Sequence, residues 1–407
     1  MTKRRILFVD DEAPVLESLR NLLRKYRTVW DLVFALSGAE ALELLEANPC
    51  DVVVADMRMP GMDGAALLAE VKARHPATVR LVLSGHADRD AIVRALPVAH
   101  QYLSKPCDAD VLRAVIERTC ALQTRLNNPT IGAVVGRLDQ VPSAPQVYWD
   151  LTALLERDDV ALAQVARLVE QDPAMVAKLL QLVNSAYFGL ARRVTSAEQA
   201  VTYLGVQLVR SLALSIQVFD SKPITTSGFS VDRLQRTSLW TGRVARRIAS
   251  AAGVGDDAFT AGLLRDLGQL VLARAMPDQF VKVAAELAGG QRPIAEVESE
   301  GFGATHADVG AYLIGVWGLP VSIIEAVAYH HEPRQASPES LSLVRAIHIA
   351  DALVEWASRG GTDAEATGAL DVEFLERTGG MADLAKWCEF AQAEVGLGAE
   401  PALGVAS

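Results

Sequence analysis

The chain has 407 residues, of which 50% are hydrophobic and 22% are charged. This length and composition predict two or three folded domains and exclude a disordered chain. The net charge is −11, and residues 1–126 carry equal numbers of basic and acidic side chains, so the whole acidic excess lies in residues 127–407. The negative mean field of that region disfavours nucleic-acid binding.

The start of the chain and its cysteines favour a cytoplasmic protein. The basic N-terminus is followed by an apolar run of only four residues, which is too short for a signal peptide. We find no uncharged apolar stretch long enough to cross a bilayer, so we expect no membrane insertion. No CxxC pair occurs, and we therefore expect four reduced thiols, at Cys50, Cys107, Cys120 and Cys388.

The first 125 residues alternate short apolar segments with amphipathic ones. The apolar segments are typical of strands and lie at 5–11, 32–36, 51–57, 80–85 and 101–106. Helical patterns lie between them, for example at 15–26 and 38–48. Strands this apolar must be covered on both faces, which predicts a parallel five-stranded sheet in an α/β domain.

Reactive side chains stand at the ends of the predicted strands. Asp10 and Asp11 close the first strand and Asp56 closes the third, whereas Ser84 and Lys105 close the fourth and fifth. The carboxyl ends of parallel strands meet at one edge of a sheet. Three carboxylates there favour Mg²⁺, and a lysine and a hydroxyl suit an incoming phosphoryl group. The pattern predicts phosphorylation of a carboxylate, although each Asp alone could simply cap a turn or helix.

Four segments carry a family resemblance: VDDE at 9–12, DMRMPGMDG at 56–64, LSG at 83–85 and YLSKP at 102–106. Through them the chain resembles the receiver domain of two-component response regulators over nearly all of residues 3–125. The resemblance implies a flavodoxin-like receiver domain at residues 1–125. It also implies that Asp56 is the phosphoacceptor and that a histidine kinase is the phosphodonor.

The same resemblance implies roles for the other residues at this edge. Mg²⁺ is expected to bind to Asp10, Asp11, Asp56 and the backbone carbonyl of Arg58. Lys105 is expected to contact the phosphoryl group and to form a cis peptide bond with Pro106, which X-Pro bonds adopt at modest cost. Ser84 and Tyr102 match the switch pair of the family, in which the hydroxyl moves toward the phosphate while the aromatic ring turns inward.

After residue 125 the pattern becomes helical throughout. The breaker cluster NNPT and two later prolines place a linker at 126–137. The segments that follow predict an all-α domain, and they lie at 160–171, 174–184, 197–219, 238–253 and 258–274. The third of them is expected to be two helices jointed at Leu204-Gly205. In a C-terminal extension, residues 336–407, helices are expected at 341–360 and 381–396, and we expect the extension to pack on the domain before it.

Six segments of the helical region carry a second resemblance: VPSAPQV at 141–147, DPAMVAKLLQLVNSAYFG at 172–189, AVTYLG at 200–205, LLRDLGQLVL at 263–272, THADVGAYLIGVWGLP at 305–320 and AYHHEP at 328–333. Through them residues 138–335 resemble an HDOD domain, a relative of the HD superfamily of metal phosphohydrolases. The resemblance implies a helical domain with a pocket that, in the catalytic relatives, holds metal.

A catalytic HD site needs histidine and carboxylate ligands that converge from several helices. The candidates that remain here are Asp266, His306, His330, His331 and Asp351. Two expected histidines are replaced by Gly242 and Arg265, and the GYP signature of cyclic-dinucleotide phosphodiesterases is absent. A guanidinium cannot coordinate a metal. We therefore expect a vestigial site in which Arg265 and carboxylates replace the metal.

A cluster of arginines offers two interpretations. Arg243, Arg246 and Arg247 lie on the polar side of one predicted helix, and Arg192 and Arg193 stand elsewhere. They could bind phosphates or nucleotides, but such charges more often form a solvated helix face.

Together these patterns favour a response regulator whose HDOD domain is not catalytic and binds an unidentified protein partner, with a homodimer allowed. The alternative is a metal-dependent phosphohydrolase or cyclic-dinucleotide phosphodiesterase gated by the receiver. A transcription regulator ranks last, because no helix-turn-helix tail, zinc finger or basic terminal module is present.

Overall fold

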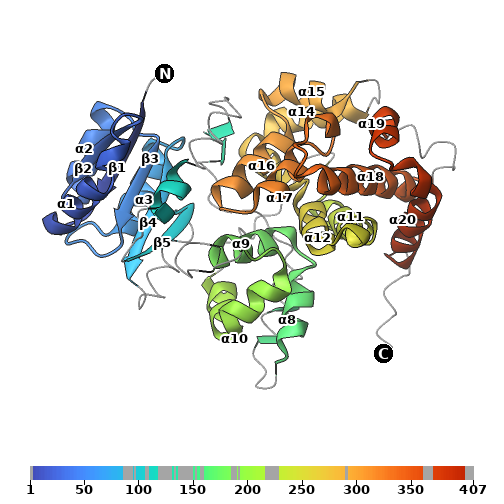
Figure 1. Cartoon of the computed structure of the whole chain (residues 1–407), viewed down its shortest axis with the longest axis horizontal. Helices are drawn as coiled ribbons and strands as arrows, with labels where there is room; N and C mark the ends of the chain where they lie inside the picture. The colour runs from blue at the N-terminus through green and yellow to red at the C-terminus, as the bar shows by residue number, and fades with distance from the viewer. Residues whose placement is uncertain are drawn as a thin grey trace.

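The computed structural model describes residues 3–85, 95, 98–105, 110–117, 131–132, 134–135, 150–151, 154–155, 160–184, 190, 193–215, 229–288, 292–360 and 370–398. An α/β domain lies beside a larger assembly of helices (Figure 1). Most of the predicted linker and the segment that follows it, including VPSAPQV, lie outside the described residues. Among the helices that are described, none has the length and apolar character needed to span a bilayer.

The N-terminal domain is built on a parallel sheet. Its strands are β1 (Arg4–Val9), β2 (Trp30–Ala35), β3 (Val52–Asp56), β4 (Val79–Gly85) and β5 (Gln101–Lys105). They pair in the order β2-β1-β3-β4-β5, and all four pairings are parallel. The predicted five-stranded flavodoxin-like sheet is therefore confirmed. Every residue of the central strand β3 is buried, as a sheet covered on both faces requires.

Three helices of this domain are described in full: α1 (Ala13–Leu22), α2 (Gly38–Ala47) and α3 (Gly64–Arg74). The side chains of Ser37 and Asp63 accept hydrogen bonds from backbone N–H groups in the first turns of α2 and α3. These caps fix where the two helices begin. The first helix is shorter than its pattern predicts, because the chain tightens into a 3₁₀ turn at Arg24–Tyr26.

The remaining described elements are helical. They are α8 (Leu162–Val169), α9 (Pro173–Val183), α10 (Ala197–Ser215), α11 (Val231–Ala249), α12 (Gly255–Leu264), α13 (Leu267–Ala275), α14 (Pro277–Ala288), α15 (Ile294–Phe302), α16 (His306–Val316), α17 (Val321–Ala328), α18 (Leu341–Ser358), α19 (Val372–Arg377) and α20 (Leu384–Gly398). In the C-terminal extension, α18 contacts α11, α12 and α17, and α20 contacts α11 and α18.

Two predictions about helix continuity have opposite outcomes. The joint expected at Leu204-Gly205 is confirmed, because Gly205 interrupts α10 with a φ of 72°. The single helix expected at 258–274 is wrong. It breaks between α12 and α13, where Asp266 has the non-helical angles φ −96° and ψ 9°. The carboxylate of Asp266 contacts the adjacent Arg265 and, in α16, His306, rather than being exposed on a helix surface.

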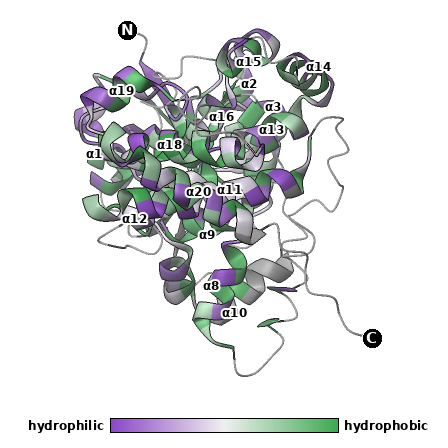
Figure 2. Ribbon diagram, turned by 90° about the vertical axis from the view of Figure 1, so that its right-hand side faces the viewer, coloured by the Kyte–Doolittle hydropathy of each residue, from purple (hydrophilic) through white to green (hydrophobic). Residues whose placement is uncertain are grey.

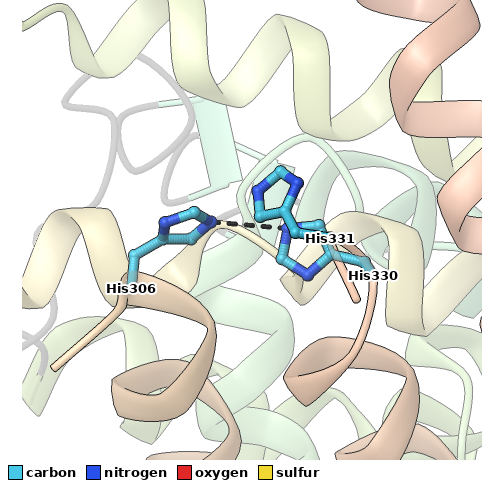
Figure 3. Close-up of side chains that lie close together, drawn as sticks. All are labelled: His306, His330 and His331. Carbon is cyan, nitrogen blue, oxygen red and sulfur yellow. Dashed lines mark hydrogen bonds between the residues drawn. The ribbon is translucent and has the colours of Figure 1, made fainter. Parts of the chain in front are cut away.

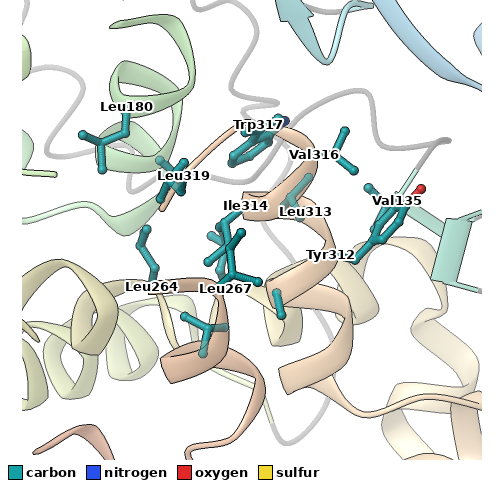
Figure 4. Close-up of a cluster of buried hydrophobic side chains, with 14 of the residues drawn as sticks. Val135, Leu180, Leu264, Leu267, Tyr312, Leu313, Ile314, Val316, Trp317 and Leu319 are labelled. Atoms are coloured by element: carbon teal, nitrogen blue, oxygen red, sulfur yellow. The ribbon is translucent and has the colours of Figure 1, made fainter. Parts of the chain in front are cut away.

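Helix α16 lies at the centre of the helical domain. All of its residues except Asp308 are buried. Figure 4 shows Leu313 and Ile314 of this helix packed near Leu264 and Leu267. The hydropathy colours of Figure 2 show hydrophobic segments around α16 and α18, as expected for helices that are surrounded by others.

Close helix contacts at glycines hold this centre together. A Cβ atom at Gly268 of α13 would lie 1.9 Å from the carbonyl oxygen of His306, the first residue of α16. A Cβ atom at Gly242 of α11 would lie 2.8 Å from the carbonyl oxygen of Phe259 in α12. There is thus no room for the histidine that the resemblance would place at position 242.

We predict that Gly268→Ala destabilises the helical domain by about 3 kcal/mol, because α13 and α16 must move apart to admit the methyl group. The matched control is Gly396→Ala in α20, where a Cβ atom meets open space. The control should be neutral or stabilising by up to about 1 kcal/mol. Urea unfolding followed by circular dichroism measures both, and equal stabilities would contradict the close contact.

Candidate functional site

Two acidic residues predicted from the strand ends meet at one lysine. The Nζ atom of Lys105 lies 2.5 Å from Oδ1 of Asp56 and 2.7 Å from Oδ2 of Asp10. Asp10 is buried and Asp56 is 7% exposed. The side chains therefore converge from β1, β3 and β5 at the carboxyl edge of the sheet, where ligands of this fold class bind.

The backbone also holds these carboxylates in place. The N–H of Glu12 donates to Oδ1 of Asp10 at 3.0 Å, and the N–H of Arg58 donates to Oδ2 of Asp56 at 2.8 Å. Burial by itself lowers the pKa of Lys105, but its hydrogen bonds with Asp10 and Asp56 outweigh burial and the pKa is raised. The lysine is therefore a fixed positive charge between two carboxylates.

A glycine allows the chain after Asp56 to return toward it. A Cβ atom at Gly64 would lie 2.2 Å from the carbonyl oxygen of Asp56, and the N–H of Gly64 donates to the carbonyl oxygen of Met57 at 3.1 Å. The turn between them uses Gly61 at a φ of 76°, which favours glycine. The motif DMRMPGMDG thus has two glycines that the local backbone requires.

For the other residues predicted at this edge, the structure describes only part of the expected arrangement. Asp11 follows β1 and is exposed. Tyr102 is fully buried, its hydroxyl has no hydrogen-bond partner among the described residues, and burial raises its pKa well above 10. The backbone of Ser84 lies in β4, but its side chain is outside the described part of the structure, and so is Pro106 with the predicted cis bond.

In the helical domain, Arg265 lies between two carboxylates. Its Nη2 atom is 2.8 Å from Oδ2 of Asp266, and its Nε atom is 2.5 Å from Oδ1 of Asp351 in α18. The Nη1 group donates to the carbonyl oxygen of Gly262 at 3.0 Å. Arg265 is 3% exposed. The structure therefore brings the predicted residues Arg265, Asp266 and Asp351 together.

His306 continues this arrangement on the other side of Asp266. Its Nε2 atom lies 3.3 Å from Oδ1 of Asp266, and its Nδ1 atom lies 2.7 Å from Oε2 of Glu298 in α15. Burial lowers the pKa of His306, but Glu298 and Asp266 outweigh burial and raise the pKa to about 10. His306 is therefore a second buried cation at neutral pH.

His330 and His331 stand beside this histidine (Figure 3). One ring nitrogen from each of the three histidines lies within 4.8 Å of those of the other two. His330 donates from Nδ1 to the carbonyl oxygen of Val327 at 2.7 Å, which leaves its Nε2 as the acceptor for Nε2 of His306 at 3.4 Å. Burial lowers the pKa of His330 and of His331, so both rings are neutral at pH 7.

Five side chains thus alternate in charge through the interior. We call this set the charge chain, and its members in order are Asp351, Arg265, Asp266, His306 and Glu298. Arg265 and His306 are the two cations that neutralise the three carboxylates. Buried carboxylates need such partners, because an isolated buried charge is costly.

A cavity of about 230 Å³ opens beside the charge chain. Its lining comes from α11, α13, α15 and α18 and includes Arg265, Asp266, His331 and Asp351. The Nε2 atom of His331 is buried and has no hydrogen-bond partner among the described residues. A ligand in this cavity would therefore find the unsatisfied Nε2 atom of His331 close to the paired charges.

The arginine cluster of α11 mainly joins helices. The guanidinium of Arg247 lies 3.8 Å from the ring centroid of Phe390, and Nη1 of Arg243 lies 3.5 Å from Oε2 of Glu394. Both partners belong to α20. These contacts join α20 to α11, and the sequence of α20 alone does not predict them.

Arg246 of the same helix and Arg193 have other partners. Arg246 pairs with Asp256 at 3.2 Å, and Arg193 donates to the carbonyl oxygen of Asn184. Arg192 lies outside the described residues. Arg193 and Arg246 thus each have a partner within the chain.

Sequence reasoning missed Glu298, although a signal for it exists. Glu298 lies on the same face of α15 as four residues at helical spacing, which are Ile294, Val297, Gly301 and Phe302. A glutamate on an apolar face indicates a buried charge with a partner.

Comparison with known families matches both domains. The model of the response regulator receiver domain matches residues 6–117, and the model of the HDOD domain matches residues 141–333. The chain is a response regulator with a receiver domain and an HDOD domain. Both resemblances drawn from its sequence are confirmed.

Individual relatives share parts of this organisation. The crystal structure of the MmoQ response regulator from Methylococcus capsulatus is 25% identical, with a TM-score of 0.50 over 61% of this chain and 98% of that chain. An uncharacterized Treponema pallidum protein is 27% identical over 252 residues, which are 61% of this chain and 48% of that protein.

The DNA-binding transcriptional regulator NtrC of Escherichia coli is 42% identical over 103 residues, which are 23% of this chain and 22% of NtrC. The receiver–HDOD chain thus spans about half of the Treponema protein and less than a quarter of NtrC.

The raised pKa of His306 predicts a pH dependence of stability. A histidine whose folded pKa lies above its unfolded value stabilises the fold fully below pH 6.5, and this contribution is lost as the pH rises through about 10. Urea unfolding at pH values from 6.5 to 10 should therefore show falling stability. Glu298→Gln should reduce the slope, and an equal slope in this variant would contradict a protonated His306.

Proposed function

We propose that this response regulator accepts a phosphoryl group on Asp56 from a histidine kinase and signals through a non-catalytic HDOD domain that binds a protein partner. The observation that carries the first half is the convergence of Asp10 and Asp56 on Lys105 at the carboxyl edge of the sheet. A nucleophilic carboxylate beside a fixed cation is the chemistry that phosphoryl transfer to an aspartate needs.

The donor set at this edge fits Mg²⁺, because it consists of carboxylate oxygens that already meet within hydrogen-bond distance of one cation. Asp10, Asp11, Asp56 and the backbone carbonyl of Arg58 would hold the ion. When bound, it would neutralise charge on the incoming phosphate. Lys105 is placed to leave Asp56 for a phosphoryl oxygen while Asp10 stays within its reach.

We predict that Asp56→Ala abolishes Mg²⁺-dependent labelling of the chain by a small phosphodonor such as acetyl phosphate, because the attacking oxygen is gone. Asp63→Asn is the control, since Asp63 lies in the same motif but only caps α3, which an asparagine also does. Labelling of the Asp56→Ala protein would contradict the assignment.

The charge chain supports an HDOD domain that works without a metal. Arg265 and protonated His306 supply the positive charge that a metal would bring, and Arg265 cannot act as a ligand. A site whose cations are side chains keeps the helices together but has no Lewis acid to activate water. Binding of a partner is then the output that remains for this domain.

Elemental analysis of the purified protein should accordingly find no stoichiometric transition metal. Arg265→His restores a possible ligand next to Asp266, so this variant should gain metal relative to the native chain when both are purified alike. Stoichiometric metal in the native chain would contradict replacement of the metal by Arg265.

The second candidate is a receiver-gated phosphohydrolase. The grouping of His306, His330 and His331 beside a cavity favours it. Hydrolysis of cyclic dinucleotides by the native chain with Mn²⁺ or Fe²⁺, lost on His331→Ala, would establish this activity in place of the non-catalytic output.

A further inference from the structure

The cavity beside the charge chain has apolar and charged walls. Most of its lining comes from α11 and α18, which lie side by side (Figure 1). Its apolar part is formed by Leu234, Ile294 and Val354. Its volume of about 230 Å³ is below the range of about 300–1,000 Å³ that is usual for drug-sized ligands, so a small metabolite fits better than a dinucleotide. Four lining residues are exposed and form what we call the mouth: Ser230, Arg233, Glu355 and Ser358.

The wall formed by α18 has an excess of negative charge. Oδ1 of Asp351 lies 2.5 Å from Nε of Arg265, but Oδ2 of Asp351 has no hydrogen-bond partner among the described residues. Glu355 follows one helical turn later and pairs with Arg359 at the surface. Carboxylates at this spacing repel each other, and partial burial, followed by the charge of Asp351, raises the pKa of Glu355. A cationic group in the cavity would relieve this repulsion.

The first turn of α11 brings the opposite charge to the mouth. Arg233 is exposed, lines the cavity and has no acidic partner among the described residues. The hydroxyl of Ser230 accepts a hydrogen bond from the backbone N–H of Arg233 at 3.2 Å, which fixes this turn beside the cavity. The start of a helix also carries partial positive charge. An anionic group is therefore favoured next to Arg233.

The inner end of the cavity adds no further positive charge that needs a partner. Arg265 is already held by Asp266 and Asp351. Burial lowers the pKa of His331, so its ring is neutral at pH 7, and its Nε2 atom has no hydrogen-bond partner among the described residues. The unbalanced charges of the lining thus stand apart, positive on α11 and negative on α18.

We propose that this cavity binds a small zwitterion of the amino carboxylate class. The ammonium group lies between Asp351 and Glu355, the carboxylate pairs with Arg233, and the carbon chain packs against the apolar part of the lining. A simple amine would leave Arg233 without a partner, whereas a simple acid would leave the two carboxylates of α18 without one.

This inference goes beyond the proposed function, because it gives the HDOD domain a small-molecule ligand in addition to a protein partner and does not depend on Asp56. A ligand in this position bridges α11 and α18. It therefore stabilises the folded helical domain by mass action.

The test uses the full chain without a phosphodonor and measures thermal unfolding and calorimetric affinity. The probes are ε-aminocaproate and L-leucine, which carry both charges at different separations, and hexylamine and hexanoate, which each carry one. Arg233→Gln and Glu355→Gln each remove one charge of the mouth. Their matched controls are Arg236→Gln in α11 and Glu389→Gln in α20, since both residues are exposed and lie outside the cavity lining.

We expect one or both amino carboxylates to bind the native chain at millimolar concentration and to raise its Tm, with hexylamine and hexanoate binding more weakly. Arg233→Gln and Glu355→Gln should each weaken binding roughly 5-fold, which is the effect of one partly exposed ion pair, and the controls should bind like the native chain.

Three results would overturn the zwitterion site: a native chain that binds neither amino carboxylate, equal binding of hexylamine or hexanoate, or mouth variants that bind as tightly as their controls. None of them bears on the phosphorylation of Asp56, which the labelling experiment tests separately.

Discussion

The ion pairs of Arg265 with Asp266 and Asp351 are the constraint on which the centre of the helical domain depends. They join the turn between α12 and α13 to α18, and His306 extends the same charge chain to Glu298 in α15. Arg265, Asp266 and His306 are each buried between two opposite charges, so loss of one of them leaves its neighbours with fewer partners. Such a set is strongly cooperative, although the net gain over an apolar core is small.

This constraint also explains why the pocket survives in a domain that we propose to be non-catalytic. The same residues that hold the helices line the cavity of about 230 Å³. The residues that the resemblance relates to a metal site are here held by ion pairs with one another. Retention of His306 and Asp266 is therefore compatible with a binding domain as well as with an enzyme.

The receiver and the HDOD domain form one connected system through β5. Lys105 at one end of the strand contacts the carboxylates, and Gln101 at the other end contacts α16. The acidic edge and the charge chain are each stable arrangements of opposite charges.

The sequence predicted the receiver domain in detail because its signals are local. Each strand is a short apolar run, and Asp10, Asp56 and Lys105 stand at strand ends that a parallel sheet must bring together. The helical domain was predictable in its class and in most helices. The break at Asp266 was not, because one partner of that carboxylate, His306, is distant in sequence.

Contacts between domains were also beyond sequence reasoning. Gln101 and Gln181 bind backbone carbonyls, which every residue has, so neither side chain is marked by a complementary partner in the sequence. Glu298 could have been found from its place on an apolar helix face. His306 was named from the sequence, but its pairing with Glu298 was not, since no rule of spacing connects the two elements.

A double-mutant cycle of Arg265→Met and Asp351→Asn tests the charge chain most directly. Unfolding free energies of the native chain, both single variants and the double variant give the coupling between the two side chains. Our account predicts a coupling of about 2–3 kcal/mol, because Arg265→Met leaves the carboxylate of Asp351 without its partner and Asp351→Asn removes that charge. Additive effects, with a coupling near zero, would contradict the view that Arg265 holds this domain together.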